Sequence, residues 1–125
     1  MALSATNTGV LKNLSQDLPP GATRHFKNVS DNNSATAESL VASPGAGRKL
    51  ILTHITVGTL TAQSISILDG ATTVLFGPVQ LEAAGIIYSK DFQWGLELTA
   101  ATAMYVDSDS DALFHMYIEY IDAPA

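Results

Sequence analysis

Three aspartates alternate along the chain like the start of a calcium-binding loop. Asp107, Asp109 and Asp111 are separated by single serines, so three carboxylates could gather around one hard cation. The rest of the loop is missing, because no glycine stands at the sixth position and Ile118 holds the twelfth, where a bidentate glutamate is needed. Two interpretations remain, a weak cation site and a solvated acidic loop, and the sequence favours the second.

The histidines and serines do not form a recognisable catalytic or metal-binding set. His25, His54 and His115 lack the spacing of metal ligands. No serine stands in a G-x-S-x-G setting, and the absence of cysteine excludes thiol chemistry. The sequence therefore predicts a protein that is not an enzyme and that uses no cofactor.

One short segment combines the residue types of a sugar-binding site. Asp91-Phe92-Gln93-Trp94 places an indole near a carboxylate and an amide, which together could stack on a sugar ring and bind its hydroxyls. Aromatic side chains more commonly fill cores and interfaces. Carbohydrate binding therefore stays the alternative interpretation of this segment.

The composition indicates that part of the surface is hidden in an assembly. Only 14% of the 125 residues are charged, against about 25% in an average globular domain, while 46% are hydrophobic. Residues 1–49 hold five basic and three acidic residues, whereas residues 50–125 hold one basic and nine acidic residues. An acidic body argues against nucleic-acid binding, which needs a basic stripe. The N-terminus also lacks the apolar core of a signal peptide, and no run is long enough to span a membrane.

Short alternating segments with turn signals about every ten residues predict an all-β domain. The segment 48–69 is predicted to be a hairpin, and its first strand is apolar on both faces, as expected for a strand buried on both sides. A second hairpin is predicted over 103–121, across the acidic loop. The remaining strands are expected at 36–42, 72–76, 79–81, 86–92 and 96–99.

The last predicted strand, 113–121, has two different faces. Phe114, Met116, Ile118 and Tyr120 form a wholly apolar face, which suits a core. The opposite face is mixed and carries aromatic residues, as subunit interfaces do. We expect the oligomer contact there, with Trp94 as a further interface aromatic. The candidate interface residues are Leu113, His115, Tyr117, Glu119 and Trp94.

Eight or nine short strands predict a single β-sandwich over residues 36–125, and an eight-stranded jelly roll accounts for them best. The long strands at 49–57 and 113–121 are expected to pair in the middle of a sheet. An immunoglobulin-like sandwich is the alternative, although its cysteine and tryptophan signature is missing. Residues 1–35 are rich in Ser, Thr, Asn and Gly and read either as a flexible leader or as an arm that orders on a partner.

Residues 36–125 resemble the small jelly-roll decoration, or cement, proteins of tailed-phage heads. The likeness lies in a series of features and not in one sharp motif. They are LVASPGAG, the basic-then-apolar RKLILTHITV, SISILDG, FGPVQLEAAG, the aromatic YSKDFQWGLEL, and the closing AMYV and FHMYIEY.

The resemblance implies a structural role in the virion. Proteins of this kind sit as homotrimers on the outside of an icosahedral shell, bind the major capsid protein and stabilise contacts between capsomers. By likeness, this protein would be made in the host cytoplasm, and residues 1–35 would be the arm that grips the shell or a neighbour. The candidate arm contacts are Val10, Leu11, Leu14, Arg24 and Phe26. The alternative function is a tail or fibre domain that binds host carbohydrate.

Overall fold

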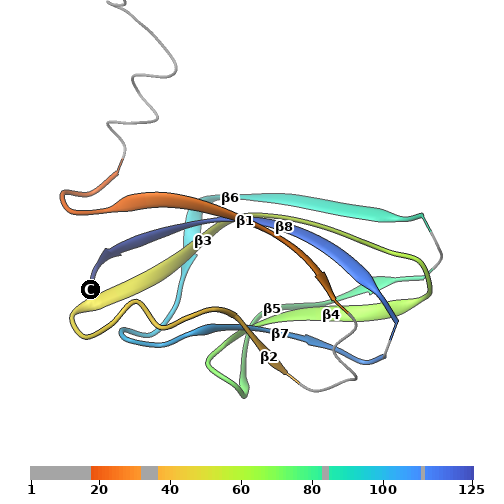
Figure 1. Ribbon diagram of the computed structural model, residues 1–125. Helices are drawn as coiled ribbons and strands as arrows, with labels where there is room; N and C mark the ends of the chain where they lie inside the picture. The colour runs from red at the N-terminus through yellow and green to blue at the C-terminus, as the bar shows by residue number, and fades with distance from the viewer. Residues whose placement is uncertain (1–17, 32–36, 83–84, 111) are drawn as a thin grey trace, which may run out of the picture.

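The computed structural model describes residues 18–31, 37–82, 85–110 and 112–125, which form two β-sheets packed face to face (Figure 1). No helix occurs among these residues, so none of them forms a helix that could cross a membrane. The strands are β1 (Thr23–Asp31), β2 (Glu38–Val41), β3 (Arg48–Thr59), β4 (Gln63–Asp69), β5 (Thr73–Leu81), β6 (Ile87–Glu97), β7 (Met104–Ser108) and β8 (Phe114–Pro124).

The strand order identifies the sandwich as a jelly roll. The first sheet has the order β1-β8-β3-β6 and the second the order β2-β7-β4-β5. The first two strands therefore pair with the last two, β1 with β8 and β2 with β7, and all pairs are antiparallel. Two such Greek keys in facing sheets make a jelly roll. The predicted eight-stranded sandwich is confirmed, and so is the expected pairing of β3 with β8.

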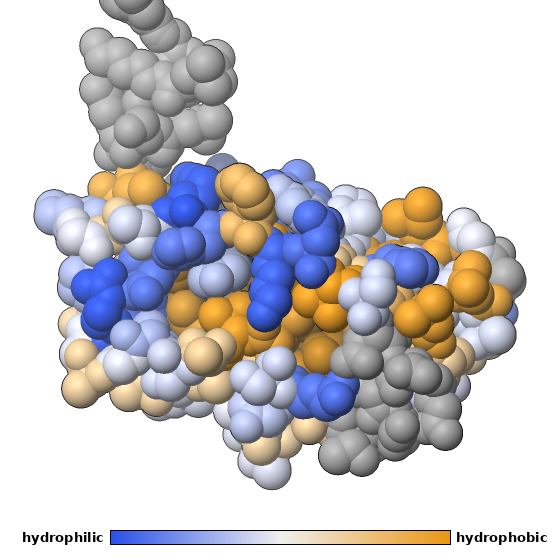
Figure 2. Space-filling model, in the orientation of Figure 1, coloured by the Kyte–Doolittle hydropathy of each residue, from blue (hydrophilic) through white to orange (hydrophobic). Residues whose placement is uncertain are grey.

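The core lies between the two sheets. Alternate residues are buried along most of β3 and β8 in the first sheet and along β7 in the second, and Figure 2 shows apolar surface between the layer that carries β1 and the layer that carries β2. Eleven large side chains of the described residues are almost fully buried. They are Phe114, Leu50, Leu52, Ile55, Ile65, Ile67, Leu81, Met104, Ile118, Val57 and Val106.

A β-bulge at Thr53 explains why β3 reads as apolar on both faces. Thr53 is one extra residue relative to β8, so the alternation changes phase there. Leu50 and Leu52 point into the core before the bulge, and Ile55 and Val57 do so after it. The prediction that this strand is buried on both sides is therefore wrong. One face is buried along its whole length, and the bulge makes it switch from even to odd positions.

Both of the long predicted hairpins are wrong, because the chain changes sheets inside each of them. β3 lies in the first sheet and β4 in the second, and β7 lies in the second sheet and β8 in the first. The predicted turn at Asp69-Gly70, by contrast, does connect a hairpin, that of β4 and β5. Gly70 has a φ of 76°, which favours glycine.

A buried polar cluster holds the two crossings together at one end of the sandwich. The amide of Gln63 donates to the hydroxyl of Thr59 and to the carbonyl oxygen of Ala112, and it accepts a 2.9 Å hydrogen bond from Ser108. Thr59, Gln63 and Ser108 are all buried. Polar groups at this depth need partners, so the cluster fixes how the ends of β3 and β7 meet the starts of β4 and β8.

The sandwich begins earlier than the sequence predicts. Residues 23–31 fall inside the expected arm, yet they form β1, which pairs with β8 along its full length. Its described side chains are exposed except that of Val29, which packs against the core. The strand has the polar composition of a leader because it lies at a sheet edge and contributes little to the core.

We predict that Gln63→Ala lowers the free energy of unfolding by about 2 kcal/mol, because Ser108 and two backbone carbonyls lose a buried partner. The matched change Gln80→Ala, on an exposed position of β5, should change it by less than about 0.5 kcal/mol. Urea denaturation followed by circular dichroism measures both. Equal effects of the two variants would contradict a special role for the cluster.

Candidate interaction surface

The solvent-facing side of the first sheet carries most of the sequence-predicted interface residues, and we call it the outer face. Residues that pair directly across strands point to the same side of a sheet. The register places His54 beside Glu119, Thr56 beside Tyr117, and Gly58 beside His115. The other outer-face residues follow from the pairing of β1 and β6. They are Arg24, Phe26, Asn28, Ser30, Ile87, Ser89 and Asp91.

The structure brings three of the five predicted interface residues together. His115, Tyr117 and Glu119 follow one another along the outer face of β8. Leu113 comes just before this strand, and its carbonyl oxygen accepts hydrogen bonds from Thr59 and Gln63. Trp94 lies on the edge strand β6. It lines the same hollow as Glu119, whereas His115 lines a different one.

Polar side chains form a connected row across the middle of the outer face. His54 Nδ1 lies 2.6 Å from Asp91 Oδ1, and His54 Nε2 lies 2.7 Å from the hydroxyl of Thr56. Thr56 in turn is hydrogen-bonded to Ser89 at 2.9 Å. Nearer the end of the sheet, Ser30 Oγ and His115 Nδ1 are 2.7 Å apart. These bonds hold the side chains of four adjacent strands in fixed orientations.

Tyr117 lies at the centre of this row. Its hydroxyl donates to Glu119 Oε2 at 3.1 Å, and its ring contacts those of Phe26 and His54. Burial raises the pKa of Tyr117, and the hydrogen bond to Glu119 and the negative charge of that carboxylate raise it further. Tyr117 is therefore a neutral hydrogen-bond donor at physiological pH.

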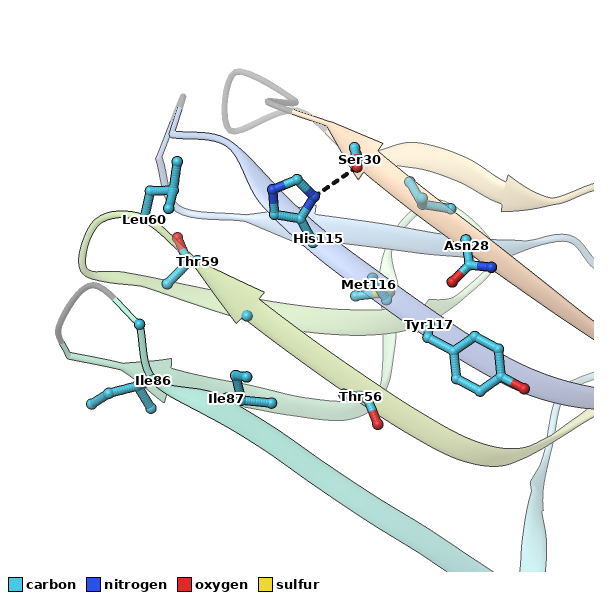
Figure 3. Close-up of a pocket in the computed structure, with 13 residues that line it drawn as sticks. Asn28, Ser30, Thr56, Thr59, Leu60, Ile86, Ile87, His115, Met116 and Tyr117 are labelled. Carbon is cyan, nitrogen blue, oxygen red and sulfur yellow. Dashed lines mark hydrogen bonds between the residues drawn. The ribbon is translucent and has the colours of Figure 1, made fainter.

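An apolar hollow of about 410 Å³ lies at the end of the outer face where β3 and β6 come together, and we call it the Ile87 hollow (Figure 3). Leu60, Ile86 and Ile87 are exposed along its rim, Ile87 to 70%. His115 and Tyr117 lie across from them on β8. The combination of an apolar rim with polar groups beside it is typical of a subunit contact.

A second hollow, of about 740 Å³, lies toward the other end of the outer face, and we call it the Trp94 hollow. Here β6 bulges away from β3, because residues 92–95 stand opposite the single residue Thr53. Gly95 makes this possible. It has a φ of 76°, and a side chain there would collide with Ile51.

The acidic loop is described only in part, and no three His, Asp or Glu side chains are grouped to hold an ion among the residues that the structure describes. Asp109 instead accepts a 2.8 Å hydrogen bond from the backbone N–H of Ser64, and this bond lowers the pKa of Asp109. Asp107 lies on β7 opposite Ser66. Asp111 lies outside the described residues.

The candidate arm contacts fall in two places. Val10, Leu11 and Leu14 lie outside the described residues. Arg24 and Phe26 belong to the outer face of β1, and the Phe26 ring lies 6.5 Å from that of Tyr117. These two residues are therefore part of the same surface as the predicted interface.

Sequence reasoning did not identify the rim of the Ile87 hollow. Ile86 and Ile87 were predicted only as the start of a strand at 86–92, with no role at a surface, and Leu60 lies in the crossing from β3 to β4. Nothing in the local pattern distinguishes an exposed isoleucine on an edge strand from a buried one. The residues around Trp94 differ, because the sequence had already indicated the Asp91–Trp94 segment as a candidate sugar-binding site.

Comparison with known proteins gives structural likeness alone. No protein-family model matches the chain, and no characterised protein matches its sequence. Among solved structures, the chain is similar to one in the capsid asymmetric unit of cyanophage Pam1, with 16% identity, a TM-score of 0.54, and coverage of 98% of this chain and 100% of that one. It is also similar to the tobacco streak virus coat protein in its dimer, with 17% identity, a TM-score of 0.50, and coverage of 87% and 90%. These proteins share its fold.

We predict that Asp109→Ala lowers the free energy of unfolding by about 1 kcal/mol at pH 7, because the N–H of Ser64 loses a charged acceptor at an exposed site. The folded-state pKa is lowered, so this stabilisation is present above the ordinary pKa of 3.8 and is lost as the pH falls through the folded-state value. Chemical denaturation at pH 7 and near pH 2 measures the change. Asp109→Asn, which keeps an acceptor without the charge, is the control. If Asp109→Ala lowered the free energy of unfolding equally at both pH values, the stabilisation would not come from the ionised carboxylate of Asp109.

Proposed function

We propose that the protein is a decoration, or cement, protein of a tailed phage, which binds the outside of the assembled head as a homotrimer and strengthens contacts between capsomers. The observation that carries the proposal is the likeness to a chain of the Pam1 capsid unit along almost the whole of both chains. The coat protein of tobacco streak virus, in a second kind of virus, supports a structural role in the virion. The role is not enzymatic, and the protein is made in the host cytoplasm before it joins the shell.

The outer face supports self-association. It exposes Leu60, Ile86 and Ile87 beside a row of oriented hydrogen-bonding groups. Exposed apolar residues gathered at one place are uncommon on a protein that stays monomeric. We assign the trimer contact to the Ile87 hollow together with His115 and Tyr117, and Leu113 lies at its border.

Attachment to the major capsid protein is assigned to the segment that precedes the sandwich. Because β1 belongs to the folded body, the arm of the proposal is shorter than residues 1–35 and consists of residues 1–17. Val10, Leu11 and Leu14 are its apolar contacts. Arg24 and Phe26 lie on the outer face of β1, where they can join the same contact.

Avidity explains how individually weak contacts can hold the protein on the shell. Three arms on one trimer meet a repeating lattice, so once one arm is bound the others act at a high effective concentration. A protein that binds the assembled shell in preference to free subunits stabilises the shell by mass action. A net charge of -6 keeps the unattached protein soluble.

We predict that Ile87→Asp converts the trimer to a monomer in solution, because a carboxylate would be desolvated in the contact. Light scattering of the purified protein measures the change in molar mass. Val74→Asp is the matched control, since Val74 is exposed on β5 in the second sheet, and this variant should stay trimeric. A trimer for both variants would place the contact elsewhere, and a monomeric unchanged protein would remove the avidity argument.

We predict that a chain beginning at Leu18 stays trimeric but binds assembled heads at least about tenfold more weakly, since avidity through the arms is lost. Co-sedimentation with undecorated heads of the phage that encodes the protein measures this. A chain beginning at Thr36 is unsuitable, because it also lacks β1. Unchanged sedimentation of the shortened protein would show that residues 1–17 are not the attachment segment.

A further inference from the structure

Trp94 is the most exposed large apolar side chain in the described part of the protein, at 88%. Burying an indole removes more apolar surface from water than burying almost any other side chain does. An indole this exposed therefore indicates a binding partner. We propose that the Trp94 hollow is a binding site for a neutral saccharide, which stacks on the indole and hydrogen-bonds to the carboxylates around it. This activity is separate from shell decoration.

The backbone is shaped to display the indole. Residues 92–95 bulge from the edge of β6 opposite Thr53, and a bulge at a sheet edge re-aims the side chains it carries. Gly95 is required there, because its positive φ and its close approach to Ile51 leave no room for a side chain. The nearby Phe92 packs against Phe76 and the core. The bulge is thus anchored on its inner side, while Trp94 is presented on the outside.

Oriented polar groups surround the indole. The carboxylate of Asp91 is 87% exposed, yet its Oδ1 is fixed by His54, which is itself held by Thr56. A carboxylate has about four acceptor positions, so Asp91 can accept further hydrogen bonds from sugar hydroxyls. Glu119 and Gln93 line the same hollow and offer a second carboxylate and an amide.

These surroundings favour a saccharide over a second protein. The centres of protein interfaces are depleted in charge, and covering Asp91, Glu97 and Glu119 with another subunit would desolvate three carboxylates. A pyranose ring has an apolar C–H face for the indole and hydroxyls at its edge for the carboxylates. The hollow, at about 740 Å³, has the size of sites that take small ligands.

The charge of the hollow selects among saccharides. Three carboxylates line it, against the guanidinium of Arg24 and the imidazole of His54. Glu97 is paired with Lys49 at 2.6 Å and Asp91 contacts His54 at 2.6 Å, while Glu119 is the third carboxylate that lines the hollow. Sialylated or uronic sugars would place a like charge beside them, so the expected ligand is neutral.

The experiment uses the full chain, in which Trp94 is the single tryptophan and therefore the source of the indole fluorescence. Lactose, maltotriose, cellotriose and chitotriose are titrated separately, and saturation-transfer NMR reports which sugar protons contact the protein. We expect at least one of them to change the Trp94 emission in a saturable way, with a Kd on the order of 1 mM. Sialyllactose should bind at least about tenfold more weakly than the tightest-binding of the four neutral saccharides or not at all.

Variants separate the site from the rest of the outer face. Trp94→Ala should abolish saturation transfer, and Asp91→Asn should raise Kd about tenfold because a charged acceptor is lost. Phe26→Ala is the matched control, since it removes another exposed aromatic from the same face and should leave sugar binding unchanged. Circular dichroism confirms that each variant is folded.

Two results would overturn the proposal. One is the absence of any emission change or saturation transfer with all four saccharides at concentrations far above 1 mM. The other is an emission that depends on protein concentration and not on sugar, because Trp94 would then lie in a contact between copies. The first result leaves the trimer assigned to the Ile87 hollow untouched, whereas the second would also move the contact between copies to the Trp94 end of the outer face, which the Ile87→Asp variant tests independently.

Discussion

The burial of one amide side chain constrains how this chain passes between its two sheets. Gln63 starts β4 at the point where the chain has just left β3, and it is hydrogen-bonded to Ser108 at the end of β7 and to the carbonyl of Ala112 before β8. An amide buried this deeply is stable only when its donors and its acceptor are used. Both crossings must therefore lie side by side at one end of the sandwich. That requirement distinguishes the jelly roll from a simple meander of the same strands.

This constraint is also what the sequence could not reveal. Alternation along 48–69 and 103–121 located the strands well, and it gave the correct inner face of β8, from Phe114 to Tyr120. Alternation is a local property, however, and a strand reads the same whether its neighbour in sequence lies beside it or in the opposite sheet. The bulge at Thr53 added a second error, since a change of phase looks like a strand that is apolar on both faces.

The outer face was predictable to the extent that it depends on one strand. His115, Tyr117 and Glu119 were identified because they alternate with core residues of β8. Ile87 was not, because its exposure depends on β6 being an edge strand, a fact of topology. The arm boundary failed for a related reason. β1 is held mainly by backbone pairing with β8 and contributes Val29 to the core, so its sequence carries almost no hydrophobic pattern.

The two bulges divide the outer face into chemically different halves. On one side of Thr53 the strands β3 and β6 stay paired and carry His54, Asp91 and, at the far end, the apolar rim of the Ile87 hollow. Opposite Thr53, residues 92–95 of β6 bulge from the sheet and present Trp94, and β6 pairs with β3 again at Leu96 and Glu97. His54 and Asp91 lie at the boundary, and their 2.6 Å contact ties the bulging strand to the centre of the sheet. The proposed protein contact and the proposed saccharide site thus lie at opposite ends of one face, because the register change keeps the two groups of side chains apart.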